Sequence, residues 1–485
     1  MTEASAPTTS IERVRTGVAG LDAVLGGGLL QGGVFLVMGS PGAGKTILSN
    51  QICFVHARDA SCAVYVTLLA ESHSRMLSHI ERMDFYEPSV VAKSVFYLSG
   101  YSALEEKKLE GLLDLVRREA RQRRAKLIVI DGLVTGGAAA EPELTLRKFV
   151  HELKAFTEMN GCICVITTSS TENPSGHYPV RTMVDGLIEL RLSRMGMRTA
   201  RELEVVKLRG SRQLMGVHLF EISSAGIKVF PRVEAIYGRS PPRELPRERQ
   251  RLGVEGLDRM LGGGVLAGSA TTILGPPGSG KTLLGLAFLK EGARRGEVGL
   301  YFGFFETPPR LIDKAEGVGL ALRREVGEGK VDLQWLAPLE QHADAVIQRL
   351  LGLVEERGAT RLVIDGIAGI AQGMLHHERL EQVVIALTNE LRARAVTTLV
   401  TEGSGLEPTG GQRVPFGRFS AAADNIIVLR YRERLRALRR YVSILKMREG
   451  RYDASMRQFS ISERGFTVDG GRRRTDLLRG VGGGG

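Results

Sequence analysis

GSPGAGKT (39–46) and GPPGSGKT (275–282) are the two stretches that decide the fold of this 485-residue chain. Both match the pattern G-x-x-x-x-G-K-[ST] of a phosphate-binding loop. Glycines allow the backbone N–H groups to surround phosphates, and the following helix N-terminus adds partial positive charge. Each stretch follows an apolar strand pattern and precedes a helix pattern. The sequence therefore predicts two nucleotide sites in one chain.

All eight residues of each loop are predicted to bind ATP. They are Gly39, Ser40, Pro41, Gly42, Ala43, Gly44, Lys45 and Thr46 in the first loop, and Gly275, Pro276, Pro277, Gly278, Ser279, Gly280, Lys281 and Thr282 in the second. Lys45 and Lys281 are expected to contact the β- and γ-phosphates as catalytic cations. The threonines at the ends of the loops are expected to bind Mg²⁺.

The loops belong to a longer internal repeat. Residues 17–46 align without a gap with residues 253–282, and two later landmarks recur in the same order. KLIVIDG (126–132) corresponds to RLVIDG (361–366), and VVKLRG (205–210) to ILKMREG (444–450). This repetition predicts a tandem duplication. We expect a disordered N-terminus at 1–10, domains at 11–237 and 252–468, a Pro- and Arg-rich linker at 238–251 and a basic, Gly-rich tail at 469–485.

The strand patterns indicate the fold class. Runs such as AVYVTLL, LIVIDG and TTLVTEG are almost continuously apolar, which is typical of parallel strands covered by helices on both faces. The sequence thus predicts an α/β protein with two P-loop NTPase domains, each a mostly parallel sheet flanked by helices.

Carboxylates follow several of these strands. Asp131 and Asp365 end apolar strands, where a carboxylate would hold Mg²⁺; a turn or helix-cap role is the alternative. Glu71 and Glu306 follow the second core strand of each copy and are candidate catalytic residues that orient the attacking water. The alternative for both is a first-turn helix residue favoured by the helix dipole.

A cationic pair occurs near the end of each copy. Lys207 with Arg209, and Lys446 with Arg448, lie two residues apart on one face of a predicted strand. They form either a solvated stripe or a group that reaches the phosphates of a neighbouring subunit.

Composition narrows the function only slightly. The net charge of +12 permits nucleic-acid or acidic partners but selects none of them. The four cysteines fit no zinc template. No apolar run is long enough to span a membrane and no signal peptide is visible, so the expected location is the cytoplasm.

Together, the repeated GLD–LGGG–GKT block, the ID strands and the KLRG/KMRE strands resemble the KaiC family over roughly residues 11–468. The resemblance implies two tandem RecA-like ATPase domains that bind ATP and Mg²⁺. It also implies a double-ring homohexamer with ATP between subunits, in which the Lys/Arg pairs sense the neighbour's γ-phosphate. The second ring of the clock proteins phosphorylates itself on an adjacent Ser-Thr pair.

The chain departs from this family pattern at two places. The family has two successive glutamates after the second strand, whereas this chain has FFETP with Phe305 and LLAES with Ala70. The phosphorylated pair corresponds to Ser420 and Ala421, so Ser420 alone is the candidate phosphosite, and a plain helix-start role is the alternative. We therefore expect weak hydrolysis or kinase activity.

Three functions remain open at this point. The leading one is an ATP-hydrolysing regulatory protein of the KaiC type, with a Ser autokinase activity in the second domain and unknown signalling partners. The second is a RecA/RadA-like DNA-dependent ATPase, which is not favoured because the N-terminal four-cysteine zinc motif of the bacterial relative is absent. The third is a scaffold that binds ATP in order to assemble and turns over negligibly.

Overall fold

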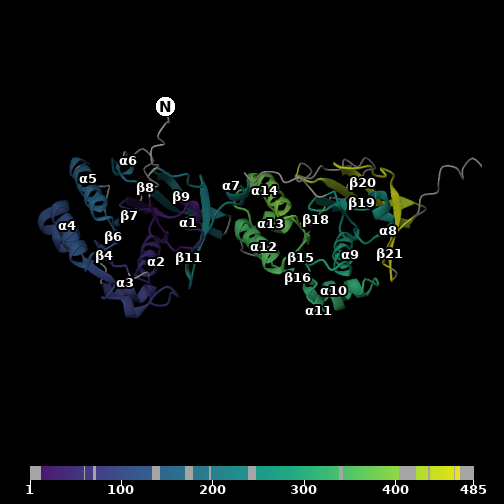
Figure 1. Ribbon diagram of the computed structural model, residues 1–485, viewed down its shortest axis with the longest axis horizontal. Helices are drawn as coiled ribbons and strands as arrows, with labels where there is room; N and C mark the ends of the chain where they lie inside the picture. Colours follow the sequence, from purple (N-terminus) through teal and green to yellow (C-terminus); the bar gives the residue numbers. More distant parts are fainter. Residues whose placement is uncertain are drawn as a thin grey trace, which may run out of the picture. The chain divides into compact units, whose positions relative to one another are not determined.

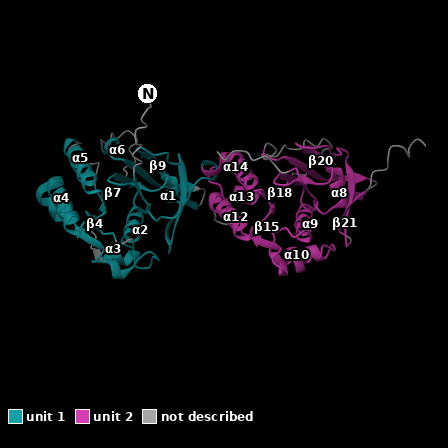
Figure 2. Cartoon of the chain, in the orientation of Figure 1, with its two compact units in different colours: residues 1–235 teal, residues 236–485 magenta. Residues whose placement is uncertain are grey.

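The computed structural model describes residues 12–58, 61–68, 73–133, 143–169, 179–195, 198–238, 247–337, 342–403, 422–434, 437–463 and 465–469. The chain divides into two compact units, residues 1–235 and 236–485 (Figure 2). Each unit is built around one nine-stranded sheet with helices packed on it (Figure 1). The predicted α/β class with two mostly parallel sheets is confirmed.

In the first unit the strand order is β11-β10-β9-β8-β3-β7-β6-β4-β5. Strands β3 to β8 pair in parallel, and β9 to β11 extend one edge in antiparallel pairs. Their bounds are β3 Val34–Gly39, β4 Ala63–Thr67, β5 Val95–Ser99, β6 Leu127–Asp131, β7 Ile163–Ser169, β8 Gly186–Met195, β9 Arg198–Leu208, β10 Val217–Ser223 and β11 Gly226–Phe230.

The helices of the first unit cover both faces of this sheet. Their bounds are α1 Leu21–Val24, α2 Lys45–Arg58, α3 His73–Ile80, α4 Tyr101–Arg123, α5 Glu143–Asn160, α6 Pro179–Met183 and α7 Val233–Tyr237, with a short 3-10 turn at Pro88–Val90. Alternate residues of β3 enter different cores: Phe35 packs in the cluster that includes α2, whereas Leu36 packs in the cluster that includes α4 and α5. Because both faces are buried, the strands are apolar throughout.

The second unit repeats this topology with the order β16-β15-β17-β18-β14-β19-β20-β21-β22. Its strands are β14 Ala270–Gly275, β15 Gly299–Gly303, β16 Val331–Trp335, β17 Arg361–Asp365, β18 Thr397–Gly403, β19 Asn425–Arg434, β20 Ala437–Met447, β21 Arg457–Ser462 and β22 Gly465–Val468. Its helices are α8 Glu255–Met260, α9 Lys281–Arg294, α10 Pro308–Glu316, α11 Arg323–Gly327, α12 Ala343–Arg357, α13 Ala368–Gln372 and α14 Leu380–Ala393, with a 3-10 turn at His377–Arg379.

A two-stranded sheet is formed near the beginning of each unit. β1 (Arg13–Val14) pairs with β2 (Leu29–Leu30), and β12 (Arg249–Gln250) pairs with β13 (Val265–Leu266). The end of the segment that we expected to be a linker, 238–251, is therefore ordered against the second unit. Residues 1–10 and 470–485 lie outside the described residues. Within the described part of the chain, no helix is both long and apolar enough to cross a membrane.

Candidate nucleotide-binding sites

The phosphate-binding loops lie at the carboxyl ends of the central strands. β3 ends at Gly39 and lies between β7 and β8, and α2 begins at Lys45. In the second unit β14 ends at Gly275 between β18 and β19, and α9 begins at Lys281. Open α/β sheets bind ligands at such a carboxyl edge, where the strand order reverses.

The last glycine of each loop is required by its conformation and by its surroundings. Gly44 has φ +108° and Gly280 has φ +102°, a left-handed region that disfavours side chains. An added Cβ at Gly280 would lie 2.6 Å from Cδ1 of Ile461, and one at Gly44 would lie 2.9 Å from Cδ1 of Ile222. The antiparallel extension of each sheet thus packs directly against the loop.

Each loop lysine lies over its own loop. The Nζ of Lys45 donates to the carbonyl oxygens of Gly39 at 2.8 Å and Ser40 at 3.1 Å. Lys281 makes the same contacts with Gly275 at 2.7 Å and with the next residue at 3.0 Å. Burial lowers the pKa of both lysines, and the nearby aspartates act in the opposite direction. The ammonium groups are therefore held at the place where phosphates would bind.

The predicted Mg²⁺ ligands are adjacent in both units. Thr46 Oγ1 donates to Oδ2 of Asp131 at 3.2 Å, and Thr282 Oγ1 donates to Oδ2 of Asp365 at 2.8 Å. Hydroxyl and carboxylate oxygens are the hard donors that Mg²⁺ prefers, and this ion usually keeps several waters. A pair of oxygen donors beside a phosphate cradle fits Mg²⁺ bound together with a nucleotide.

Sequence reasoning missed two further hydroxyls on each aspartate. Tyr65 donates to Oδ2 of Asp131 at 2.7 Å, and Thr167 donates to Oδ1. In the second unit Tyr301 and Thr401 donate to Asp365, both at 2.5 Å. The two tyrosines are separated along the sequence by the same number of residues as the two loops. The two threonines are separated by the same number of residues as the two aspartates. The internal repeat could therefore have identified all four hydroxyl groups. These hydroxyls fix the orientation of each carboxylate.

The second unit has an aromatic ring where the family has its first glutamate. An added Cβ at Gly366 would lie 2.4 Å from a ring carbon of Phe305, so this ring covers the backbone directly after Asp365. Phe305 is 59% exposed. Glu306 is engaged with Lys314 of α10, with Oε1 and Nζ 2.6 Å apart. This carboxylate is thus neutralised by its own unit.

One more carboxyl group lies at the same sheet edge. Glu402 directly follows Thr401 on β18, and burial raises its pKa to about 6. Its Oε2 is buried, with no hydrogen-bond partner among the described residues. Glu71 and Ser420 lie outside the described residues, and their roles stay predictions.

The Lys/Arg pairs lie on β9 and β20, near the amino ends of the parallel strands of each sheet. The loop of the same unit lies at the carboxyl ends of those strands. Lys207 pairs with Leu187 on β8, and Leu187 pairs with Leu36, three residues before the start of the loop at Gly39. At about 3.3 Å per residue, this separation is about 10 Å along the strand. Lys446 has the same relation to Gly275. These cations are therefore remote from the phosphates of their own unit.

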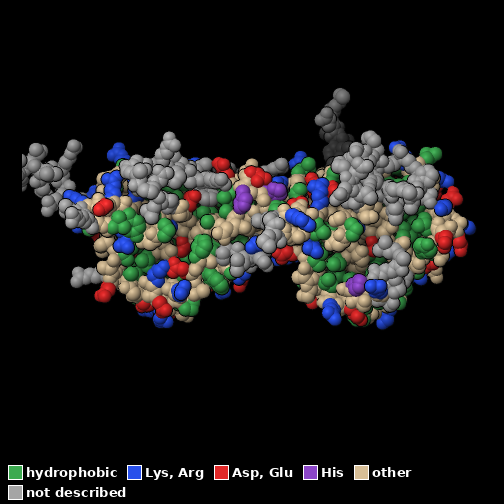
Figure 3. All heavy atoms as spheres, turned by 180° about the vertical axis from the view of Figure 1, so that it is seen from behind, with side chains coloured by type: hydrophobic (Ala, Val, Ile, Leu, Met, Phe, Trp, Pro, Cys, Tyr) green, Lys and Arg blue, Asp and Glu red, His purple; other side chains and the backbone are tan. Residues whose placement is uncertain are grey.

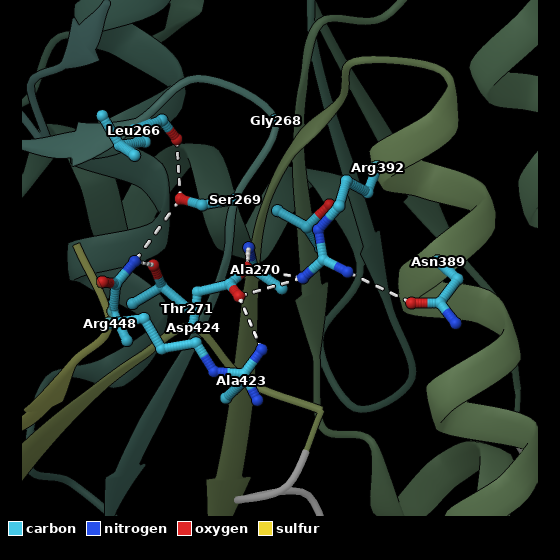
Figure 4. A network of polar contacts seen from close by, with 12 residues as sticks. Leu266, Gly268, Ser269, Ala270, Thr271, Asn389, Arg392, Ala423, Asp424 and Arg448 are labelled. Atoms are coloured by element: carbon cyan, nitrogen blue, oxygen red, sulfur yellow. Dashed lines mark hydrogen bonds and ion pairs between the residues drawn. The ribbon is translucent and has the colours of Figure 1, made fainter. Parts of the chain in front are cut away.

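Local contacts hold these cations in place. Arg448 and Arg392 both point toward Asp424, with nitrogen–oxygen distances of 3.4 and 2.8 Å, and the backbone N–H of Ala270 donates to the same carboxylate (Figure 4). Lys446 donates to the carbonyl oxygen of Ala423 at 2.7 Å. Burial, and then the charge of Arg448, lower the pKa of Lys446.

The first unit has the same arrangement around Asp185. Val34 N–H donates to this carboxylate, Lys154 lies 2.5 Å from it and Arg209 lies 3.7 Å from it. Lys207 donates to the carbonyl oxygen of Thr182 at 2.7 Å. The two Lys/Arg pairs thus contact carbonyl and carboxylate oxygens of their own unit, while the Arg209 and Arg448 side chains stay 50% and 51% exposed.

Charge is mixed on the face drawn in Figure 3. On the face drawn in Figure 3, acidic and basic side chains are interspersed on both units. The net charge of +12 therefore does not form one continuous basic field on the described part of that face.

Comparison with known proteins agrees with this geometry. A family model described as "ATPase: KaiC" matches residues 14–234 and 250–472. The circadian clock oscillator protein KaiC of Picosynechococcus sp. is 26% identical over 468 residues, covering 94% of this chain and 90% of that protein. The proteins of the same name from Rippkaea orientalis (26% identical; 97% and 91% covered) and Synechococcus elongatus (25%; 94% and 89%) are similar over the same extent.

Proposed function

This chain belongs to the KaiC family of ATPases, and from that premise we propose that it is a regulatory protein that binds ATP in both units and hydrolyses it mainly in the first. One observation carries the proposal: both units hold the same constellation of loop lysine, loop threonine and strand-end aspartate. Bound Mg²⁺ would neutralise charge on the phosphates, and Thr46 with Asp131, or Thr282 with Asp365, would hold it.

Two contacts support slow hydrolysis in the second unit. The Phe305 ring covers the backbone beside Asp365, and Glu306 is paired with Lys314. A positioned general base typically contributes about 10²–10⁴-fold to a rate, so pairing of Glu306 with Lys314 would remove most of this contribution from the matching glutamate. We propose that ATP in the second unit serves mainly to hold a conformation or an assembly.

We also propose that nucleotide sites are completed between subunits of a homo-oligomer, with a hexamer as the expected state. Lys207 and Lys446 lie about 10 Å along the strand from their own loops. This separation supports a role for these cations at the phosphates of another copy. They would act there as arginine fingers act, by stabilising charge on the transferred group.

Mixing two inactive variants tests this sharing. Lys45→Ala lacks the lysine of the phosphate-binding loop, and Arg209→Ala lacks the arginine of the Lys/Arg pair. Each variant alone should therefore lose most of its phosphate release. Mixed oligomers contain some sites with an intact cradle and an intact sensor, and activity should return. A mixture that stays as inactive as its components would show that each site is complete within one chain.

Labelled ATP distinguishes the remaining functions. The purified protein, Lys45→Ala, Lys281→Ala and Ser420→Ala are incubated with γ-labelled ATP and Mg²⁺. We expect released phosphate that falls at least tenfold in Lys45→Ala and much less in Lys281→Ala. Label on the protein that disappears in Ser420→Ala would add the autokinase activity. ATP binding without any release would leave the ATP-assembled scaffold.

A further inference from the structure

The hairpin of β19 and β20 carries a set of arginines in addition to the loop, aspartate and Lys/Arg residues described above. β19 runs parallel to β14, and Val428 lies opposite Leu274, so the following residues continue past the carboxyl edge of the sheet. This outer part of the hairpin contains Arg430, Arg432, Arg434, Arg439 and Arg440.

The strand register places four of these arginines on one face. Arg432 pairs directly with Arg439, Arg430 pairs with Tyr441, and Arg434 follows two residues further along β19. Paired residues and every second residue share a face of a strand pair. We call this set (Arg430, Arg432, Arg434, Arg439 and Tyr441) the arginine face.

The described residues leave the guanidinium groups of the arginine face without an ion-pair partner. Within the described part of the chain, none of its four guanidinium groups forms an ion pair. Arg432, Arg434 and Arg439 are exposed. Burial, and then the charge of Arg432, lower the pKa of Arg430. Like charges directly opposite each other destabilise a strand pair, so this arrangement costs stability in the free protein.

The equivalent hairpin of the first unit shows the contrast. There Arg191 stands in the place of Arg430, and it lies 2.7 Å from Glu189 and 3.1 Å from Glu204. These two glutamates are replaced by Val428 and Ser443 in the second unit. The places of Arg432 and Arg439 are taken by Ser193 and Ala200, and that of Tyr441 by Glu202. Two hairpins of the same register thus differ in charge, because this face carries paired arginine and glutamates in the first unit and unpaired arginines among the described residues of the second.

We propose that the arginine face binds the phosphate backbone of single-stranded nucleic acid. Arginines at every second strand position are about 6.8 Å apart, which presents a regular row of cations to an extended polyanion. The guanidinium fork binds phosphate oxygens in a bidentate manner. Tyr441 lies on the same face and offers a ring on which a base could stack, a combination typical of single-strand binding grooves.

Affinity for a labelled oligothymidylate, measured by fluorescence anisotropy without ATP, tests this proposal on the full chain. Four phosphate contacts predict a slope of about −2.8 in log affinity against log salt concentration. Arg432→Ala/Arg439→Ala should weaken binding at least tenfold and reduce that slope by about 1.4. Arg432→Lys/Arg439→Lys should keep the salt slope, because the charges remain, and should bind between the wild type and the double alanine variant, because lysine lacks the bidentate fork. The matched control Arg191→Ala removes an ion-paired arginine of the first unit and should leave binding unchanged.

Three results would overturn the proposal. They are unchanged binding in the double alanine variant, equal affinity for a duplex of the same sequence, and competition by polyglutamate as strong as by unlabelled oligothymidylate. The last result would assign the face to an acidic protein segment. Because no ATP is present, failure of this test is separate from failure of the proposed ATPase function. Unfolding followed by the fluorescence of the single tryptophan, Trp335, checks that the variants fold.

Discussion

Replacing Tyr301 with Phe removes one of three hydroxyl groups that hold the Asp365 carboxylate. The Tyr301 hydroxyl donates to Oδ2 at 2.5 Å, and the side chain is only 1% exposed, so water does not replace it readily. A hydrogen bond to a charged group contributes about 1.5–3 kcal/mol. We therefore expect the free energy of unfolding of the second unit to fall by about 2 kcal/mol, while the packing of the ring is unchanged.

Urea unfolding followed by tryptophan fluorescence measures this loss. Trp335 is the only tryptophan and pairs with Gly303 on β15, two residues from Tyr301, so it reports on the second unit. With a urea dependence of about 2–3 kcal/mol per molar, the midpoint should fall by about 0.7–1 M.

Tyr65→Phe removes the equivalent hydroxyl of the first unit and is the matched control. It should leave the tryptophan transition in place and lower the transition of the first unit, followed by circular dichroism. A Tyr301→Phe midpoint within 0.2 M of the wild-type midpoint would refute the reasoning that this hydroxyl holds the carboxylate.

Three other changes give expected outcomes. Phe305→Glu in a Lys45→Ala background should raise phosphate release at least tenfold, because it restores a carboxylate beside Asp365; an unchanged rate would show that the ring is not what slows this site. Glu402→Gln should raise the urea midpoint of the tryptophan transition at neutral pH. The folded unit binds the proton of Glu402 more tightly than the unfolded chain does, so ionisation of this carboxyl group lowers the stability of the wild type as pH rises from about 4.5 through about 6. The difference between the two midpoints should vanish below about pH 4.5, and a difference that is the same at every pH would contradict this cause. Gly280→Ala should weaken ATP binding in the second unit at least tenfold, as judged by titration with a fluorescent ATP analogue, because its φ of +102° and its contact with Ile461 both exclude a Cβ; unchanged affinity would mean that the loop tolerates the shift.

Much of the fold could be predicted from the sequence because its signals are local. The two loops, the apolar strands and the duplicated order are adjacent residues in a fixed pattern, and the predicted tandem α/β architecture is confirmed. The antiparallel extension, such as β10 and β21, was not predicted. Its strands are partly exposed and contain polar residues, so they lack the continuous apolar run of the central strands.

The polar contacts within the sites could not be predicted in the same way. Tyr65 and Thr167 lie on apolar strands, where both residue types are common for reasons of strand propensity alone. Their contacts with Asp131 depend on which strands become neighbours in the sheet. Asp185 and Asp424 were overlooked because each organises cations brought from distant helices and strands.

The phosphate-binding loop and the Lys/Arg pair of each unit lie at opposite ends of the parallel strands. This placement has a consequence for oligomers that contain both intact and substituted copies of the chain. If each site takes Lys45 from one copy and Arg209 from the next, a copy that lacks both residues damages the two sites that flank it. Activity would then follow the square of the intact fraction, so that equal amounts of intact and damaged copies would retain about a quarter of the activity. A gene that encodes such a doubly substituted chain would therefore lower the activity of the intact chains in the same cell, although the substituted chain forms no new contact.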